Sequence, residues 1–155
     1  MSLLLVTGIP GTGKTELGKY LSEHHRLRHV DMEAGDTLQS FVQDRLAFLA
    51  PLGPDVVITW GFHVAHSGDV RFLKEQGYFL VWLDGDRPSA LRAFITRATV
   101  PEVVFYLQMF TIESQSVVAQ IAPHAFLDPF REGKFRSKSE IAQELLALCG
   151  RWGAA

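Results

Sequence analysis

Short apolar runs alternate with amphipathic segments along the whole chain. Five runs of strand length are rich in β-branched and aromatic residues, and each is followed by a stretch with apolar positions at helical spacing. The five runs cover residues 3–7, 28–32, 56–60, 78–83 and 124–128. Nearly continuous apolar strands are typical of parallel sheets that are buried on both faces. The pattern therefore predicts an α/β fold, with a five-stranded parallel sheet flanked by helices on both faces.

The segments between these strands carry helix signals of their own. Residues 36–49, "DTLQSFVQDRLAFL", place apolar side chains at helical spacing and predict a helix across the whole segment. Ser67 is expected to cap the next helix and Gly77 to follow its end, while Pro88 suits the first position of the helix after that. The last helix is expected to end at Gly150, followed by a frayed tail.

Residues 99–123 break the alternation because no strand is predicted there. The stretch "VVFYLQMF" within this segment has a helical pattern. Its aromatic and methionine residues are typical of lid or core packing. We expect a short helical lid between the fourth helix and the last strand, within one domain that spans residues 1–155.

Composition excludes several classes of protein. The chain has 155 residues, of which 47% are hydrophobic and 21% charged, and its net charge of −2 disfavours a dedicated nucleic-acid binder. Cys149 is the single cysteine, so neither an internal disulfide nor a cysteine-based zinc site is expected. No apolar run approaches the length of a membrane span, and the first residues lack the features of a signal peptide. We expect a cytoplasmic protein that does not contact membranes.

Candidate chemistry begins directly after the first predicted strand. Residues 8–15, "GIPGTGKT", match the phosphate-binding pattern G-x-x-x-x-G-K-[ST], with a strand before it and a helix after it. Backbone N–H groups in such a loop form a nest for anions at the positive end of the helix. The lysine reaches the β- and γ-phosphates, and the threonine hydroxyl binds Mg²⁺. The expected nucleotide-binding residues are Gly8, Gly11, Thr12, Gly13, Lys14 and Thr15.

The nucleotide is expected to be ATP. The chain contains no asparagine, so it lacks the Asn-Lys-x-Asp motif with which GTPases read guanine. An acid at the end of the third strand, the usual metal anchor of these loops, is also missing, because that strand ends "VVITWGF". The second strand ends "VDMEAGD" and supplies Asp31 and Glu33 beside the loop. We expect Asp31 to hold Mg²⁺ and to accept the proton of an attacking hydroxyl, and Glu33 to face the acceptor.

The loop, the acid pair after the second strand and the glycine after the third together resemble the shikimate kinase and gluconate kinase group. The group's fold is similar to that of the nucleoside monophosphate kinases. The resemblance implies the P-loop NTPase fold and transfer of the ATP γ-phosphoryl group to a sugar-acid or shikimate-like hydroxyl. It also implies the metal- and acceptor-binding role for Asp31. Residues 81–114 resemble gluconate kinases after their fourth strand. Shikimate kinases place several glycines after the third strand, where this chain has "TWGFH".

Arginines are the remaining candidates for charge stabilisation. Arg92 and Arg97 precede the expected lid, and an arginine there can stabilise the γ-phosphoryl group during transfer. Arg45 falls inside an apolar helical stripe and suits an acidic acceptor. Arg131 lies in the loop after the fifth strand, which packs against adenine in kinases of this group.

The acceptor itself is left open by the sequence. Trp60, Gly61 and Phe62 follow the third strand, where an acceptor would bind. A nucleoside or nucleotide acceptor is an alternative, because these aromatic residues could stack on a base. A nucleotide-binding regulatory module with little turnover is a second alternative, which the missing acid of the third strand keeps open. The oligomeric state is not predicted.

Overall fold

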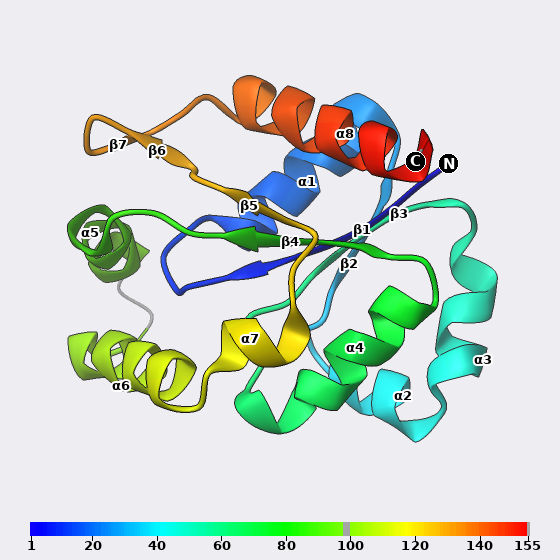
Figure 1. Ribbon diagram of the computed structural model, residues 1–155, viewed down its shortest axis with the longest axis horizontal. Helices are drawn as coiled ribbons and strands as arrows, with labels where there is room; N and C mark the ends of the chain where they lie inside the picture. Colours follow the sequence, from blue (N-terminus) through cyan, green and yellow to red (C-terminus); the bar gives the residue numbers. More distant parts are fainter. Residues whose placement is uncertain (98–99, 155) are drawn as a thin grey trace.

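A five-stranded parallel sheet forms the centre of the molecule (Figure 1). The computed structural model describes residues 1–97 and 100–154. The strands follow the order β2-β3-β1-β4-β5, and every neighbouring pair is parallel. Their bounds are Ser2–Gly8 (β1), Arg28–Asp31 (β2), Asp55–Thr59 (β3), Phe79–Leu83 (β4) and Ala125–Leu127 (β5). The predicted α/β class and all five predicted strands are confirmed.

Helices cover both faces of this sheet, so the predicted layers are also confirmed (Figure 1). The helices are α1 (Lys14–His25), α2 (Thr37–Gln43), α3 (Arg45–Leu49), α4 (Ser67–Glu75), α5 (Arg87–Arg97), α6 (Glu102–Ser114), α7 (Val117–Ile121) and α8 (Lys138–Ala154). Short 3₁₀ turns, Ala50–Leu52 and Val64–His66, follow α3 and precede α4.

Alternate residues of the central strand face two separate cores. Leu4 and Val6 of β1 point toward α1 and α8, whereas Leu5 packs in the core shared with α4 and α7. All three side chains are fully buried. This alternation puts Thr7, the next residue, on the same face as Leu5, where the described part of β1 meets the phosphate-binding loop.

Four predicted helix boundaries are wrong. Pro88 is the second residue of α5 rather than its first, because the Asp86 carboxylate accepts a hydrogen bond from the backbone N–H of Ser89 and the helix begins at Arg87. Residues 36–49 form two helices, because Asp44 adopts an extended conformation and its carboxylate accepts a hydrogen bond from the backbone N–H of Ala47. This bond caps α3. Ser67 is the first residue of α4 rather than its cap, and its hydroxyl donates to the carbonyl of Val64. The last helix continues past Gly150, because the ring of Trp152 packs against Phe79.

The segments around the fifth strand hold two further features. Residues 100–123 contain α6 and α7 and, among these described residues, no strand. After β5 the chain forms a small antiparallel hairpin, β6 (Phe130–Arg131) and β7 (Lys134–Phe135), that the sequence patterns did not predict. Each hairpin strand has only two residues, too short for a visible alternation. No helix in the described ranges is long and apolar enough to span a membrane.

Candidate functional site

The loop between β1 and α1 depends on glycine at two close approaches. Gly8 and Gly11 have φ angles of 146° and 80°. A Cβ atom on Gly8 would lie 2.2 Å from the carbonyl oxygen of Leu83, and one on Gly11 would lie 2.1 Å from that of Ala90. These neighbours are backbone atoms of β4 and α5, which cannot move aside cheaply. The loop is therefore clamped between the sheet and α5 with its N–H groups at the start of α1.

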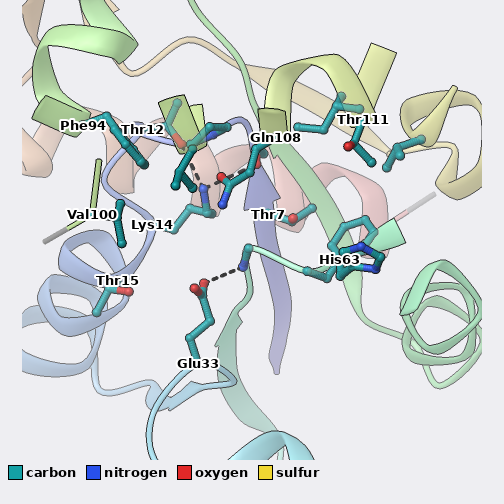
Figure 2. A pocket seen from close by; sticks show the side chains of 18 of the residues that line it. Thr7, Thr12, Lys14, Thr15, Glu33, His63, Phe94, Val100, Gln108 and Thr111 are labelled. Carbon is teal, nitrogen blue, oxygen red and sulfur yellow. Dashed lines mark hydrogen bonds between the residues drawn. The ribbon is translucent and has the colours of Figure 1, made fainter. Parts of the chain in front are cut away.

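Lys14 is the cation at the centre of this loop (Figure 2). Its Nζ atom donates to the carbonyl of Ile9 at 2.8 Å and lies 3.4 Å from both the carbonyl of Gly8 and the hydroxyl of Thr12. Burial lowers the pKa of Lys14 to about 8; the Glu33 carboxylate acts in the opposite direction, and the Arg97 guanidinium lowers the pKa further. The lysine therefore lies where oxygen atoms surround it and where phosphate oxygens would compensate its lost hydration.

A cavity of about 530 Å³ opens beside Lys14. Its phosphate end is formed by the loop together with an acid and a glycine from the neighbouring strand ends, and its far end is formed mainly by apolar side chains. The phosphate end comprises Thr7, Gly8, Pro10, Gly11, Thr12, Gly13, Lys14, Thr15, Glu33, Gly61 and Arg97, whose guanidinium acts on the pKa of Lys14. The far end comprises Phe62, His63, Val64, Trp82, Phe94, Val100, Val104, Leu107, Gln108, Thr111, Ile112 and Val117.

Glu33 crosses from the end of β2 to the end of β3. Its Oε1 atom accepts a hydrogen bond of 2.7 Å from the backbone N–H of Gly61 (Figure 2). A Cβ atom on Gly61 would lie 2.8 Å from that oxygen and 3.4 Å from Cε of Lys14. The glycine thus leaves room for a carboxylate beside the lysine. The sequence has no acid after β3, yet the fold brings one to that place from the neighbouring strand.

Asp31 lies at the end of β2 but is not among the residues that line the cavity. Its Oδ1 atom accepts a hydrogen bond of 2.9 Å from the backbone N–H of Glu33. Asp31 therefore shapes the turn that presents Glu33. Of the two acids predicted for the site, the cavity contains Glu33.

The two arginines of α5 point to different places. Arg97, at the end of the helix, lines the cavity, and its guanidinium carbon lies 5.3 Å from the ring centre of Phe94. Arg92 lies outside the lining. Its Nη2 atom donates to the Ser89 hydroxyl at 3.2 Å and to the carbonyl of Gly133 at 3.3 Å, which joins α5 to the β6–β7 hairpin. Arg97 is therefore the arginine of this pair that the fold brings to the site.

Of the residues predicted for acceptor binding, some line the cavity and others lie outside it. Gly61 and Phe62 line the cavity with Glu33, but Trp60 is 1% exposed and packs edge-on against Phe41 in the core. Arg45 also lies outside the lining. It forms an ion pair with Asp69 at 3.2 Å. The carboxylate of Asp69 thus compensates the charge that the sequence pattern left unexplained.

A second, smaller cavity of about 150 Å³ lies beside the loop on the side of α8. It is lined by Thr12, Gly13, Glu16, Leu17, Leu83, Pro129, Phe135, Arg136, Lys138 and Ile141. Arg131 does not line it and instead pairs with Glu140 of α8. Arg136 lines it and also pairs with Glu140, at 3.3 Å. The hairpin therefore contributes the exposed ring of Phe135 to this second cavity, and the residue that follows contributes the paired guanidinium of Arg136.

Two parts of the cavity wall were missed by sequence reasoning. Thr7 is 1% exposed, and its hydroxyl lacks a hydrogen-bond partner among the described residues. Its sequence signal was a polar residue at the end of an apolar strand, directly before the loop. The wall that α6 provides includes Leu107 and Gln108. These belong to the "YLQMF" stretch, whose pattern fits core packing equally well.

The cavity suits Mg²⁺ only as part of a nucleotide complex. In the described ranges no three histidine, cysteine, aspartate or glutamate side chains come together as metal ligands. Mg²⁺ commonly binds through one or two protein oxygen ligands, with phosphates and waters completing its shell. Thr15 and Glu33 both line the phosphate end and offer one hydroxyl and one carboxylate. These residues fit a phosphate-bound Mg²⁺ ion.

No family model and no curated protein matches the sequence. Solved structures do match the fold. A shikimate kinase from Bacteroides thetaiotaomicron superposes with a TM-score of 0.66 at 14% identity, covering 95% of this chain and 97% of that one. A gluconokinase from Sinorhizobium meliloti gives 0.62 at 19% identity over 97% and 93%. A shikimate kinase from Aquifex aeolicus gives 0.59 at 15% identity over 98% and 99%. The chain has the fold of the P-loop small-molecule kinases.

Proposed function

We propose that this protein transfers the γ-phosphoryl group of ATP to a hydroxyl group of a small molecule. The observation that carries the proposal is the Glu33 carboxylate, held by the Gly61 N–H beside Lys14 in a cavity that also extends along an apolar wall. A site built only to bind nucleotide would not need the apolar far end of this cavity. The arrangement offers a cation for phosphate, an acid and space for an acceptor at one place.

The charged and polar groups at the phosphate end of the cavity each have a role in this reaction. The loop N–H groups and Lys14 bind the β- and γ-phosphates, and Arg97 stabilises charge on the transferring group. Thr15 and Glu33 would hold Mg²⁺, which neutralises phosphate charge when bound. The acceptor oxygen forms a bond to the γ-phosphorus while the bond to the β–γ bridging oxygen breaks. The hydroxyl proton passes to the Glu33 carboxylate, and ADP leaves with the electron pair of the broken bond.

Glu33 takes the role that the family resemblance implied for Asp31. Its carboxylate lies 2.7 Å from a backbone donor at the end of β3 and lines the cavity, whereas Asp31 turns to the Glu33 N–H. We assign Asp31 to positioning the turn. The smaller cavity between the loop and α8 suits the adenine base, with Phe135 as its exposed aromatic surface.

The structural neighbours indicate the first class of acceptor to test. Shikimate kinase and gluconokinase act on compounds of the sugar-acid and shikimate type, which puts such compounds first in a panel. Nucleosides and nucleotides are the alternative acceptors. A regulatory module would bind ATP and release little ADP.

The test is ADP release from Mg·ATP in the presence of sugar acids, shikimate, nucleosides, nucleotides and uncharged aromatic alcohols. We expect one class of hydroxyl compound to raise release well above the background hydrolysis rate. The Lys14→Ala variant controls for contaminating kinases and should show no such rise. A flat panel, with ATP binding demonstrated by thermal shift, would contradict the kinase proposal and favour the regulatory module.

A further inference from the structure

The charges of the large cavity are gathered at its phosphate end. Among its described lining residues, the lysine and arginine side chains are Lys14 and Arg97, and both are needed for phosphate in the proposed reaction. Glu33 adds a negative charge beside them. His63 also lines the cavity, and its Nδ1 atom accepts a hydrogen bond of 3.1 Å from Ala65 N. One of its two ring nitrogens is therefore engaged by the backbone.

The wall opposite the loop is one face of α6. Val104, Leu107, Gln108, Thr111 and Ile112 line the cavity at the spacing of a single helical face. Phe62, Trp82 and Val117 line it from the other elements. A carboxylate bound against these side chains would lose its hydration without gaining a cation, which is strongly unfavourable.

The polar groups on this wall are uncharged. Gln108 and Thr111 project from α6 toward the chamber that contains Thr7 and Lys14 (Figure 2). The Thr7 hydroxyl is buried and, in the part of the chain that the structure describes, has no hydrogen-bond partner. A buried hydroxyl without a partner is costly, and Thr7 adds an uncharged polar group, not a cation, to the cavity wall. Hydroxyl and amide groups recognise neutral hydroxyl, carbonyl or amide groups.

From these observations we infer that the acceptor is an uncharged alcohol with a largely apolar, ring-bearing body, and not a sugar acid. This inference rests on the proposed function. The ring lies against Phe62 and the α6 wall, and a neutral polar substituent meets Gln108 or Thr111. The hydroxyl faces Glu33. The cavity, at about 530 Å³, is within the range of small-molecule sites that bind through apolar contact and a few polar groups.

The first experiment compares matched neutral and anionic alcohols. Mandelamide and mandelate share a ring and a hydroxyl, and methyl shikimate and shikimate share a polyol ring. Isothermal titration of the protein loaded with Mg²⁺ and a non-hydrolysable ATP analogue should show binding of the neutral member about tenfold more tightly or better in both pairs. Equal or tighter binding of the anions would overturn the inference. Absence of binding by all four compounds at about 10 mM would overturn it too.

A charge placed on the wall gives the second experiment. Gln108→Arg adds a guanidinium where the inference finds no cation for a carboxylate, so mandelate should gain about tenfold in affinity. Gln115→Arg is the control, since Gln115 follows α6 and lies outside the cavity lining. Equal effects of the two substitutions would overturn the inference, because the gain would then come from net charge alone.

ADP release with the same compounds separates this inference from the proposed function. Faster turnover of the carboxylates would leave the kinase proposal intact and reject the uncharged acceptor. Tighter binding of the neutral compounds without any stimulation of ADP release, across these compounds and the wider panel, would support the ligand class and reject phosphoryl transfer.

Discussion

The two ends of the large cavity are built in different ways. The phosphate end uses mostly the backbone of residues 8–15, and its glycines press against backbone atoms of Leu83 and Ala90. The far end, proposed to bind the acceptor and called the acceptor end from here on, uses side chains from β4, α5, α6, α7 and the loop after β3. Phosphate binding is therefore encoded in one short stretch, and acceptor recognition depends on the packing of distant segments. A change at one end should be separable from a change at the other.

The largest effect should come from the phosphate end. Lys14→Ala removes the cation that binds the phosphates, so phosphoryl transfer should fall by about a thousandfold and stabilisation by Mg·ATP should disappear. Thermal shift and ADP release measure the two losses. Lys19→Ala is the matched control, since Lys19 is an exposed residue of the same helix paired with Glu16. Retained Mg·ATP stabilisation in Lys14→Ala would contradict the assignment of the loop.

The next effect concerns the point at which the two ends meet. Glu33→Gln keeps an oxygen for the Gly61 N–H but removes the proton acceptor, so kcat should fall by about a hundredfold with ATP binding retained. Asp31→Asn should cost about tenfold or less, because Asp31 acts only through the turn. The reverse order of these two losses would restore the role that the family resemblance implied for Asp31.

The pH dependence of ATP binding tests the phosphate end alone. Lys14 has a pKa of about 8 without ligand, because burial disfavours its charged form. Bound phosphate favours the charged form, so binding above that pKa takes up a proton. Relative to its value near pH 7, affinity should fall about twofold by pH 8 and about tenfold by pH 9. The affinity is measured for ATP without Mg²⁺, in a buffer that contains a chelator. Lys14→Arg, which stays charged, should show little decrease; an equal decrease in both proteins would refute the assignment.

The smallest effect should come from the acceptor end. Leu107→Ala removes an exposed side chain of the α6 wall, so the KM for the acceptor should rise about fivefold while ATP affinity and the melting temperature change little. Leu46→Ala, also at an exposed leucine but outside the cavity, is the control. An equal change in the KM for ATP would show that the two ends are not separable.

The sequence predicted the phosphate end because its geometry is local. Glycines, a lysine and a threonine at fixed spacing between a strand and a helix are sufficient for that prediction. The acceptor end was predicted only in part. Arg45 stood out in an apolar stripe, but its partner Asp69 is 24 positions away and not visible in a periodic pattern. Arg92 and Arg97 are both arginines of α5, so the sequence cannot tell which of them reaches the site. The hydrogen bond from Arg92 to Gly133 of the hairpin makes that distinction.

Boundaries failed for similar reasons. The break between α2 and α3 depends on one side-chain bond from Asp44 to Ala47, which competes with an otherwise continuous helical pattern. The extension of α8 depends on Trp152 reaching Phe79, a residue about half the chain length away. A local capping bond decided the first boundary and a tertiary contact decided the second, and helix periodicity alone carries no information about either.

The bond between Glu33 and the Gly61 N–H also has a consequence for how proteins of this fold diversify. A backbone N–H does not depend on an acidic side chain after the third strand, so where a glycine there leaves room, a carboxylate can be supplied by a neighbouring segment and still occupy the same place. An evolving lineage could move its acid from one strand to another through intermediates that retain a carboxylate throughout. Searches that require an acid at one fixed position of a sequence alignment would discard such lineages. Searches that require a carboxylate at one place in the three-dimensional structure would keep them.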